Sequence, residues 1–305
     1  MPNTSAPAIC VRGLTKDYGR GRGVFDVNLE VDAGEVLGFL GPNGAGKTVT
    51  MRHLMGFVRP QRGTAEILGH NCFWERPQVQ VSLGYLPGEN ACMKEMAARS
   101  FLDLLAEMRG MRDHARMMEL VDVFGLDLGA RIGGMSKGNR QKVAIVAAFM
   151  ARPDVLLLDE PTSGLDPLMQ ERFLDLVEEE RARGAAILLS SHIFEEVGRA
   201  CDRVAFIRAG RVVMTCTMDE VRSMRGRGYT VEFANVRERT RWELAHGNES
   251  ANGSDRAVEL RDVRDVNALI RELSSYDVAE VTSRAQTLEE LFLHLYEGDE
   301  LSGQK

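Results

Sequence analysis

The sequence predicts an α/β protein with a mostly parallel sheet, followed by a small α+β unit. Short aliphatic runs alternate with helical patterns over roughly the first 220 residues, which is typical of a parallel sheet covered by helices. Two runs, Val36–Leu40 and 155–158, are continuously apolar, as expected for central strands buried on both faces. Over 222–228 the composition becomes rich in Arg and Gly, which indicates the end of the first unit.

The composition restricts the class of protein. The chain has 305 residues, of which 44% are hydrophobic and 27% charged, so disordered and fibrous structures are excluded. A net charge of −7 disfavours non-specific binding to nucleic acid or to an anionic membrane. The longest apolar run, 143–151, is too short to cross a bilayer, no secretory signal is visible, and the cysteines show no metal or disulfide spacing. We therefore expect a cytoplasmic protein with buried, reduced thiols.

The remaining elements of the first unit follow in chain order. A third buried strand is predicted at 185–190, and a hairpin at the sheet's edge joins 204–207 to 212–213. Two helices are predicted between the first two strands along the chain. A further helix, from about 140 to 151, ends before Pro153, which cannot continue it. The apolar stripes that predict the two earlier helices are Phe101, Leu104, Leu105 and Met108, then Met117, Leu120, Val121 and Phe124. We interpret these helices as an inserted subdomain.

The second unit combines short strands with helices. We place the domains at 8–224 and 225–305, and we expect the smaller one to pack on the first or on a partner, since about 80 residues support only a small core. The predicted elements are strands at 229–233, 257–260 and 278–282, a helix with Val263, Val266, Ile270 and Leu273, and a closing helix with Leu288, Leu291, Phe292 and Leu295.

A P-loop pattern lies between the strand Val36–Leu40 and a helical stripe at 51–55. Its glycines let backbone N–H groups curl around phosphates, Lys47 reaches the β- and γ-phosphates, and Thr48 directs its hydroxyl toward Mg²⁺. We group Thr50, in the following helix, with these residues. The order of strand, loop and helix argues against a chance Gly-rich turn and predicts a site for ATP. The pattern consists of Gly41, Pro42, Asn43, Gly44, Ala45, Gly46, Lys47 and Thr48.

Two carboxylates follow the strand at 155–158. Asp159, at the strand's end, suits a Mg²⁺ shell through a water molecule. Glu160 is one residue further, and alternation along the strand directs it elsewhere, so we predict that it is the general base for an attacking water. An acidic pair after a strand is by itself more often a turn or a helix cap. The P-loop upstream favours the nucleotide site.

Further motifs resemble those of the ATP-binding-cassette (ABC) ATPases. The resemblance covers about residues 8 to 222. It implies a P-loop ATPase fold with a mostly parallel sheet, an antiparallel N-terminal β region and a helical subdomain at about 88–150. The motifs that carry it are the signature loop Met135-Ser136-Lys137-Gly138-Asn139-Arg140-Gln141-Lys142, the D-loop Ser163-Gly164-Leu165-Asp166-Pro167, the switch segment Ser190-Ser191-His192, and Tyr18 in Asp17-Tyr18-Gly19.

The resemblance also implies roles for single residues, and each role has a plain structural alternative. Tyr18 matches the aromatic residue that stacks on adenine, and an ordinary surface aromatic is the alternative. His192 is expected to contact the γ-phosphate, and a satisfied core histidine is the alternative. Asp166 belongs to the D-loop and, with Pro167 after it, is also a good N-cap for the next helix. Both roles of Asp166 are compatible.

The signature loop departs from the family's commonest wording, Leu-Ser-Gly-Gly-Gln, at Met135, Lys137 and Asn139. Ser136 and Gly138 remain, and the resemblance assigns their hydroxyl and N–H to the γ-phosphate bound by the opposite subunit. The wording resembles the ABC-2 type exporters. A signature loop of low activity is the alternative, although a positive charge near phosphate is favourable.

A second departure lies at Gly84-Tyr85-Leu86-Pro87-Gly88-Glu89, where the family usually has a Gln that binds Mg²⁺. We predict that Glu89 substitutes for it, because a carboxylate binds Mg²⁺ through oxygen. A pure hinge to the helical subdomain is the alternative.

The resemblance implies how such a chain works. The P-loop and the signature loop serve different nucleotides, so two cassettes pair head to tail, either as a homodimer or with a related cassette. ATP closes this dimer, and hydrolysis reopens it. Separate integral membrane permease subunits receive the motion, which predicts a peripheral position on the inner face of the cell membrane. The alternatives are an importer cassette, and a non-transport ABC ATPase acting on ribosomes or chromosomes, which the net charge disfavours.

Overall fold

The computed structural model describes residues 6–88, 93–191, 193–224, 227–246, 255–263 and 265–285. The chain divides into two compact units, Met1–Met218 and Asp219–Lys305. The division lies a few residues before the boundary predicted at 224, because the short helix α8 (Met218–Met224) belongs to the second unit by its contacts.

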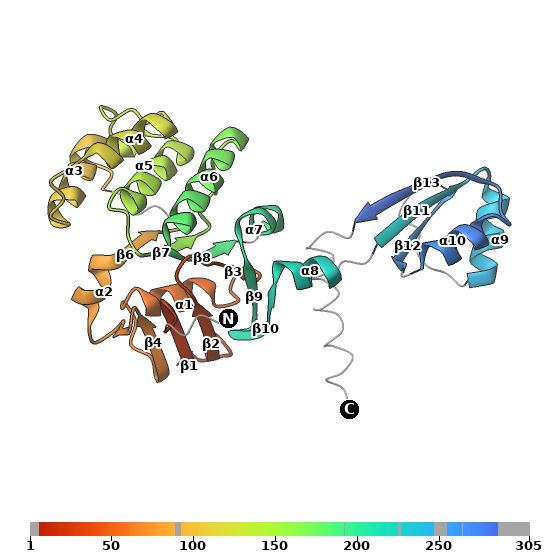
Figure 1. Ribbon diagram of the computed structural model, residues 1–305, viewed down its shortest axis with the longest axis horizontal. Coiled ribbons are helices and arrows are strands. Elements are labelled where there is room, and N and C mark those ends of the chain that lie inside the picture. The colour runs from red at the N-terminus through yellow and green to blue at the C-terminus, as the bar shows by residue number, and fades with distance from the viewer. Residues whose placement is uncertain are drawn as a thin grey trace. The chain divides into compact units, whose positions relative to one another are not determined.

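The described part of the first unit contains two sheets (Figure 1). The larger sheet has the strand order β10-β9-β3-β8-β7-β6, and all its neighbours are parallel except β10 against β9. The smaller sheet, β2-β1-β4-β5, is antiparallel. The strands are β1 (Ile9–Asp17), β2 (Gly23–Val31), β3 (Val36–Leu40), β4 (Arg62–Ile67), β5 (His70–Asn71), β6 (Leu83–Leu86), β7 (Val155–Asp159), β8 (Ala186–Ser191), β9 (Arg203–Arg208) and β10 (Arg211–Thr217). The predicted α/β fold class is confirmed.

The apolar runs of the sequence form the centre of this unit. Every residue of β3, β7 and β8 is buried, because helices or the smaller sheet cover both faces of these strands. One continuous core joins the two sheets through residues such as Leu14, Val27, Phe39 and Leu157. Cys10, Cys72, Cys201 and Cys216 are buried free thiols, whereas Cys92 lies outside the described residues. The core holds the carboxyl ends of the parallel strands in fixed register.

Helices fill the connections between the strands. No helix in the described residues is long and apolar enough to span a bilayer. The helices are α1 (Lys47–Leu54), α2 (Arg76–Ser82), α3 (Ala98–Met108), α4 (Ala115–Phe124), the 3₁₀ helix η1 (Ile132–Gly134), α5 (Lys137–Phe149), α6 (Pro167–Arg183) and α7 (Phe194–Ala200).

The helices α3, α4 and α5 form the predicted insertion between β6 and β7 (Figure 1). Helix α4 buries the expected stripe and ends at Gly125, whose φ of 57° stops the helix. The predicted face of α3 is wrong: it buries Ala98, Leu102 and Ala106, while Met108 is 75% exposed. Small residues permit the close approach of α3 to α5, and packing against a neighbour outweighs side-chain size in choosing the buried face.

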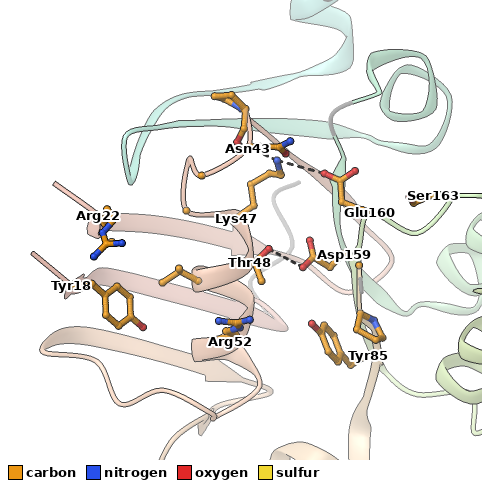
Figure 2. Close-up of a pocket in the computed structure, with 17 residues that line it drawn as sticks. Tyr18, Arg22, Asn43, Lys47, Thr48, Arg52, Tyr85, Asp159, Glu160 and Ser163 are labelled. Atoms are coloured by element: carbon orange, nitrogen blue, oxygen red, sulfur yellow. Dashed lines mark hydrogen bonds and ion pairs between the residues drawn. The ribbon is translucent and has the colours of Figure 1, made fainter. Parts of the chain in front are cut away.

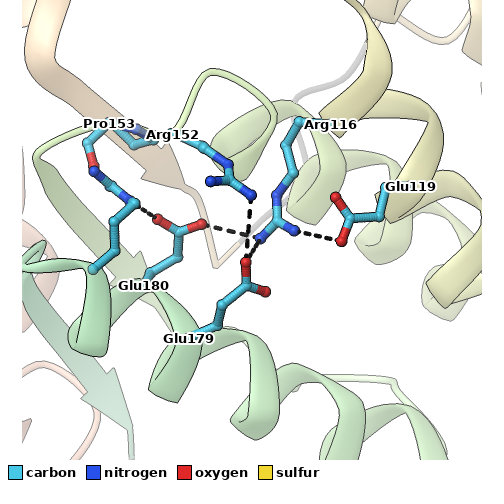
Figure 3. A network of polar contacts seen from close by, with 7 residues as sticks. Arg116, Glu119, Arg152, Pro153, Glu179 and Glu180 are labelled. Carbon is cyan, nitrogen blue, oxygen red and sulfur yellow. Dashed lines mark hydrogen bonds and ion pairs between the residues drawn. The ribbon is translucent and has the colours of Figure 1, made fainter.

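A charged network joins α4 of the insertion to α6 of the core (Figure 3). Arg116 contacts Glu119, Glu179 and Glu180 at 2.9, 2.9 and 3.1 Å, and Glu180 also pairs with Arg183 at 2.7 Å. Glu180 is fully buried and Arg116 nearly so. Burial lowers the pKa of Arg116, but the hydrogen bonds that it donates to Glu179 and Glu119, together with their negative charges, outweigh burial, so the net pKa is raised. The guanidinium therefore stays charged and clamps the two helices together.

The described part of the second unit is a three-stranded antiparallel sheet, β12-β11-β13, with two helices between its strands. Its core contains Phe233, Val258 and Leu269, and packs around Trp242. The sequence did not predict the helix α9, which supplies Trp242, and in α10 the expected Ile270 is 60% exposed. The predicted closing helix lies outside the described residues. The elements are β11 (Arg227–Phe233), α9 (Val236–His246), β12 (Ala257–Val263), α10 (Val266–Leu273) and β13 (Val278–Ala285).

Candidate nucleotide-binding site

The P-loop connects the end of β3 to the start of α1, at the carboxyl edge of the parallel sheet (Figure 2). Gly46, the residue before α1, has a φ of 115°, which only glycine adopts without strain. This turn leaves Lys47 at the first position of α1. Its ammonium donates to the carbonyl oxygens of Gly41, at 2.6 Å, and Pro42, at 3.4 Å. The lysine is therefore folded back over its own loop, at a helix N-terminus that favours anions.

Glu160 faces Lys47 across the loop. Its carboxylate lies 3.6 Å from the ammonium, and its side chain is 22% exposed, against 6% for Lys47. Strand alternation does not explain this position: β7 ends at Asp159, and Glu160 adopts a left-handed φ of 49° while its N–H donates to Ser190 O at 3.0 Å. The unusual backbone turns the carboxylate back toward the P-loop. Such conformations are stored mainly at functional sites.

A hydroxyl and a carboxylate lie together below this pair. Thr48 donates from Oγ1 to Asp159 Oδ2 at 3.0 Å, and Ser190 donates to Asp159 Oδ1. The register of β7 and β8, which aligns Asp159 with Ser190, sets the second contact. Hydroxyl and carboxylate oxygens are ligands that Mg²⁺ takes alongside phosphate oxygens and waters, so the pair fits that ion. Among the described residues, no three or more His, Cys, Asp or Glu side chains cluster closely enough to hold a metal ion by themselves. The ion would therefore depend on phosphate and water ligands as well.

These residues line one cavity of about 690 Å³. Tyr18 lies at its side, 48% exposed, with Lys16 Nζ 5.8 Å from its ring centre. An exposed aromatic ring beside an anion-binding loop offers a stacking surface for a base. The lining residues are Tyr18, Arg22, Gly23, Pro42, Asn43, Gly44, Gly46, Lys47, Thr48, Val49, Arg52, Tyr85, Pro87, Gly88, Asp159, Glu160 and Ser163.

Some expected residues do not reach the cavity. Thr50 is fully buried, and its hydroxyl donates to Gly46 O at 3.1 Å, so its side chain supports the start of α1 and does not face a ligand. Gly41 and Ala45 belong to the loop but do not line the cavity. Glu89 and His192 lie outside the described residues, and their predicted roles stay predictions.

The signature loop lies at the start of α5, away from this cavity. Ser136 is the N-cap and accepts a hydrogen bond from Asn139 N at 3.2 Å. Gly138 is in the first turn, where backbone N–H groups have no partner within the helix. Lys137 reaches the D-loop and donates to Ser163 Oγ at 2.7 Å. A Cβ on Gly138 would lie 2.6 Å from Gly164 O, so only glycine fits here.

The D-loop residue Asp166 is the N-cap of α6 and accepts from Met169 N at 3.0 Å, with Pro167 as the first helical residue. The capping role predicted for it is present. Its D-loop role stays a prediction.

Sequence reasoning missed several polar groups that support the site. Glu196 is buried and accepts hydrogen bonds from Thr162 and from Ser191, the latter at 3.1 Å, which ties the segment after β7 to the end of β8. The buried Gln141 of α5 donates to Pro161 O at 2.5 Å. Gln141 and Pro161 are 20 residues apart in sequence, and Thr162 and Glu196 are 34 apart, so no local pattern could reveal these contacts. Only Ser191 and Glu196, 5 residues apart, are close in sequence.

Fold and site together define a P-loop nucleotide-binding protein, and comparisons with known proteins specify its family. The family model for ABC transporters matches residues 24–163. DrrA3 of Streptomyces coeruleorubidus, a daunorubicin resistance ATP-binding protein, is 33% identical over 94% of this chain and 95% of its own length. NatA of Bacillus subtilis (strain 168), an ABC transporter ATP-binding protein, is 37% identical over 63% of this chain and 80% of its own.

A solved structure of an ATP-binding subunit of an ABC transporter aligns with a TM-score of 0.66 and 33% identity, covering 71% of this chain and 92% of that chain. The chain belongs to the ATP-binding subunits of the ABC transporter family.

Proposed function

We propose that this chain hydrolyses Mg²⁺-ATP and thereby powers an ABC-2 type exporter through closure of a head-to-tail dimer against separate membrane permease subunits. The observation that carries the hydrolytic part is the convergence of Lys47, Thr48, Asp159 and Glu160 on one cavity. Lys47 and the N-terminus of α1 neutralise phosphate charge, and Thr48 and Asp159 would hold Mg²⁺. When bound, the ion withdraws negative charge from the phosphate oxygens.

Glu160 is suited to orient the attacking water and accept its proton. Its carboxylate is only partly exposed and faces the P-loop lysine, the residue proposed to bind the terminal phosphates. A phosphate competes with Glu160 for Lys47, so we expect nucleotide binding to weaken the ion pair between them. We therefore keep Glu160 as the general base.

The dimer follows from the separation of two phosphate-binding features. Ser136 and Gly138 present a helix N-terminus toward solvent, on a helix that lines neither side of the P-loop cavity. Such a terminus binds anions when one is delivered to it. A second chain, related by a two-fold axis, delivers its ATP to this loop and receives the first chain's ATP in return.

The exporter assignment rests on the wording of the signature loop and on a relative named for daunorubicin resistance. The test is affinity purification of the tagged chain from its native membranes in mild detergent. Recovery of a multi-span membrane subunit together with Mg²⁺-dependent ATPase activity is expected. Recovery of ribosomes or DNA-bound proteins in its place contradicts the transport role.

A further inference from the structure

Tyr85 occupies the wall of the nucleotide cavity opposite α1 (Figure 2). It lies on β6, and its register partner on β7 is Leu157, two residues before Asp159. Since side chains alternate along a strand, Tyr85, Leu157 and Asp159 share one face of the sheet. The ring packs partly against the core, and the hydroxyl points into the cavity between Arg52 and Asp159. Within the described residues the phenol makes no hydrogen bond to protein.

Burial is the main reason that this hydroxyl stays protonated. Burial and then the charge of Asp159 raise the pKa of Tyr85 to about 12, while Arg52 acts in the opposite direction. The phenol is therefore neutral at physiological pH, with one hydrogen to donate and lone pairs that accept.

Gly88 occupies the neighbouring part of the wall, where a polar side chain would reach the same region. A Cβ at this position would lie 3.2 Å from Asp159 O and 3.5 Å from Glu160 Cβ, so the residue adjoins both carboxylate-bearing residues. Being glycine, it offers no ligand. Among the described side chains, Thr48 and Asp159 are the oxygen ligands placed for the ion, and Mg²⁺ keeps several waters when protein ligands are few.

We propose that the Tyr85 hydroxyl positions a water molecule of the Mg²⁺ shell beside Asp159, next to Gly88, which has no side chain to do so. This inference rests on the proposed function, because it requires that the cavity binds Mg²⁺-ATP. The phenol suits the task because it accepts a hydrogen bond from a metal-bound water and donates its own to a second oxygen. Tyr85 is thus a positioning residue, and it acts on the metal through water.

The variant Tyr85→Phe removes the hydroxyl and keeps the ring that packs on the core. Binding of a non-hydrolysable ATP analogue is measured by calorimetry, once in Mg²⁺ and once in EDTA. We expect the affinity in Mg²⁺ to fall roughly three- to ten-fold, the size of one hydrogen bond, with no change in EDTA. The matched control is Tyr229→Phe, the same change at a buried tyrosine of the second unit, which should alter neither affinity.

Two results overturn the inference. A variant whose affinity in Mg²⁺ equals that of the wild type shows that the hydroxyl does not touch the metal's water shell. An equal loss of affinity in Mg²⁺ and in EDTA shows that Tyr85 supports the pocket only structurally. The wild-type chain tests the proposed function separately: an affinity for the analogue that does not respond to Mg²⁺ contradicts the proposed site itself, whatever the variant does.

Discussion

The P-loop cavity and the signature loop, the two regions proposed to bind phosphate, differ in how far the chain itself completes them. In the P-loop cavity, Lys47 pairs with Glu160 and Thr48 with Asp159, so the residues proposed to bind phosphate and Mg²⁺ already lie beside one another. At the signature loop, Ser136 caps its own helix and Lys137 donates to Ser163 of the adjacent D-loop. The N-terminus of this helix faces solvent. The first region is built to bind a nucleotide alone. The second has the form of half a site, which the proposed function completes with a second chain.

Replacing Glu160 breaks the complete region at its chemical step. Glu160→Gln removes the proton acceptor but keeps the shape of the side chain, so we expect ATP hydrolysis to fall by roughly 10²- to 10⁴-fold with binding retained. Steady-state phosphate release and nucleotide binding check this. The variant should also accumulate as an ATP-bound dimer by light scattering, whereas hydrolysis at the wild-type rate removes Glu160 from the role of base.

Replacing Gly138 tests the incomplete region. In Gly138→Ala, the new Cβ meets Gly164 O at 2.6 Å, which displaces the signature loop from the D-loop. We expect hydrolysis to fall by about 10²- to 10³-fold, the loss seen when a donor to a transition-state oxygen is removed, because the displaced N–H no longer reaches that oxygen. The affinity of the P-loop for nucleotide should stay unchanged. Gly134→Ala is the matched control, because nothing lies within 4 Å of its added Cβ.

The connection between the two regions is tested at Arg116. Arg116→Met removes the cation that joins α4 to Glu179 and Glu180 of α6, while Glu180 keeps Arg183. Because a buried carboxylate loses one of its two cations, we expect the free energy of unfolding to fall by about 2 kcal/mol. Urea denaturation measures this, with the exposed Arg112→Met as control. A neutral effect would show that apolar packing alone fixes the insertion.

The smallest effect is expected at Tyr18, which is predicted to stack on the adenine of the nucleotide. Tyr18→Ala removes an exposed ring at the side of the cavity, and stacking of this kind contributes about 1 kcal/mol, so ATP affinity should fall by roughly five-fold. Tyr18→Phe keeps the ring and should bind like the wild type. Equal affinities for all three proteins would leave Tyr18 as a surface aromatic.

How much the sequence predicts depends on whether a feature is local. The P-loop, its strand and its helix were predictable, because Gly46, Lys47 and Thr48 act within one turn of chain. The buried face of α3 was not, since Ala98 and Ala106 are buried through contact with α5. The charged helix α9 was missed because Trp242 is its one buried residue among those described.

The site shows the same division. Asp159 and Glu160 were identified from their place after a buried strand, but the contact of Glu160 with Lys47 depends on a left-handed backbone that strand alternation does not predict. Tyr85 reaches the cavity because β6 pairs with β7, and Arg52 reaches it from helix α1, so no spacing in the sequence revealed that the two lie near each other.

The most direct test of the shared site mixes two inactive variants. Lys47→Ala disables the P-loop and leaves the signature loop intact, and Gly138→Ala does the reverse. In a two-fold dimer, a mixed pair contains one site with both halves intact, so mixing should restore about a quarter of the wild-type ATPase rate at equal concentrations. Activity no greater than the sum of the separate variants would contradict a nucleotide shared between two copies of this chain.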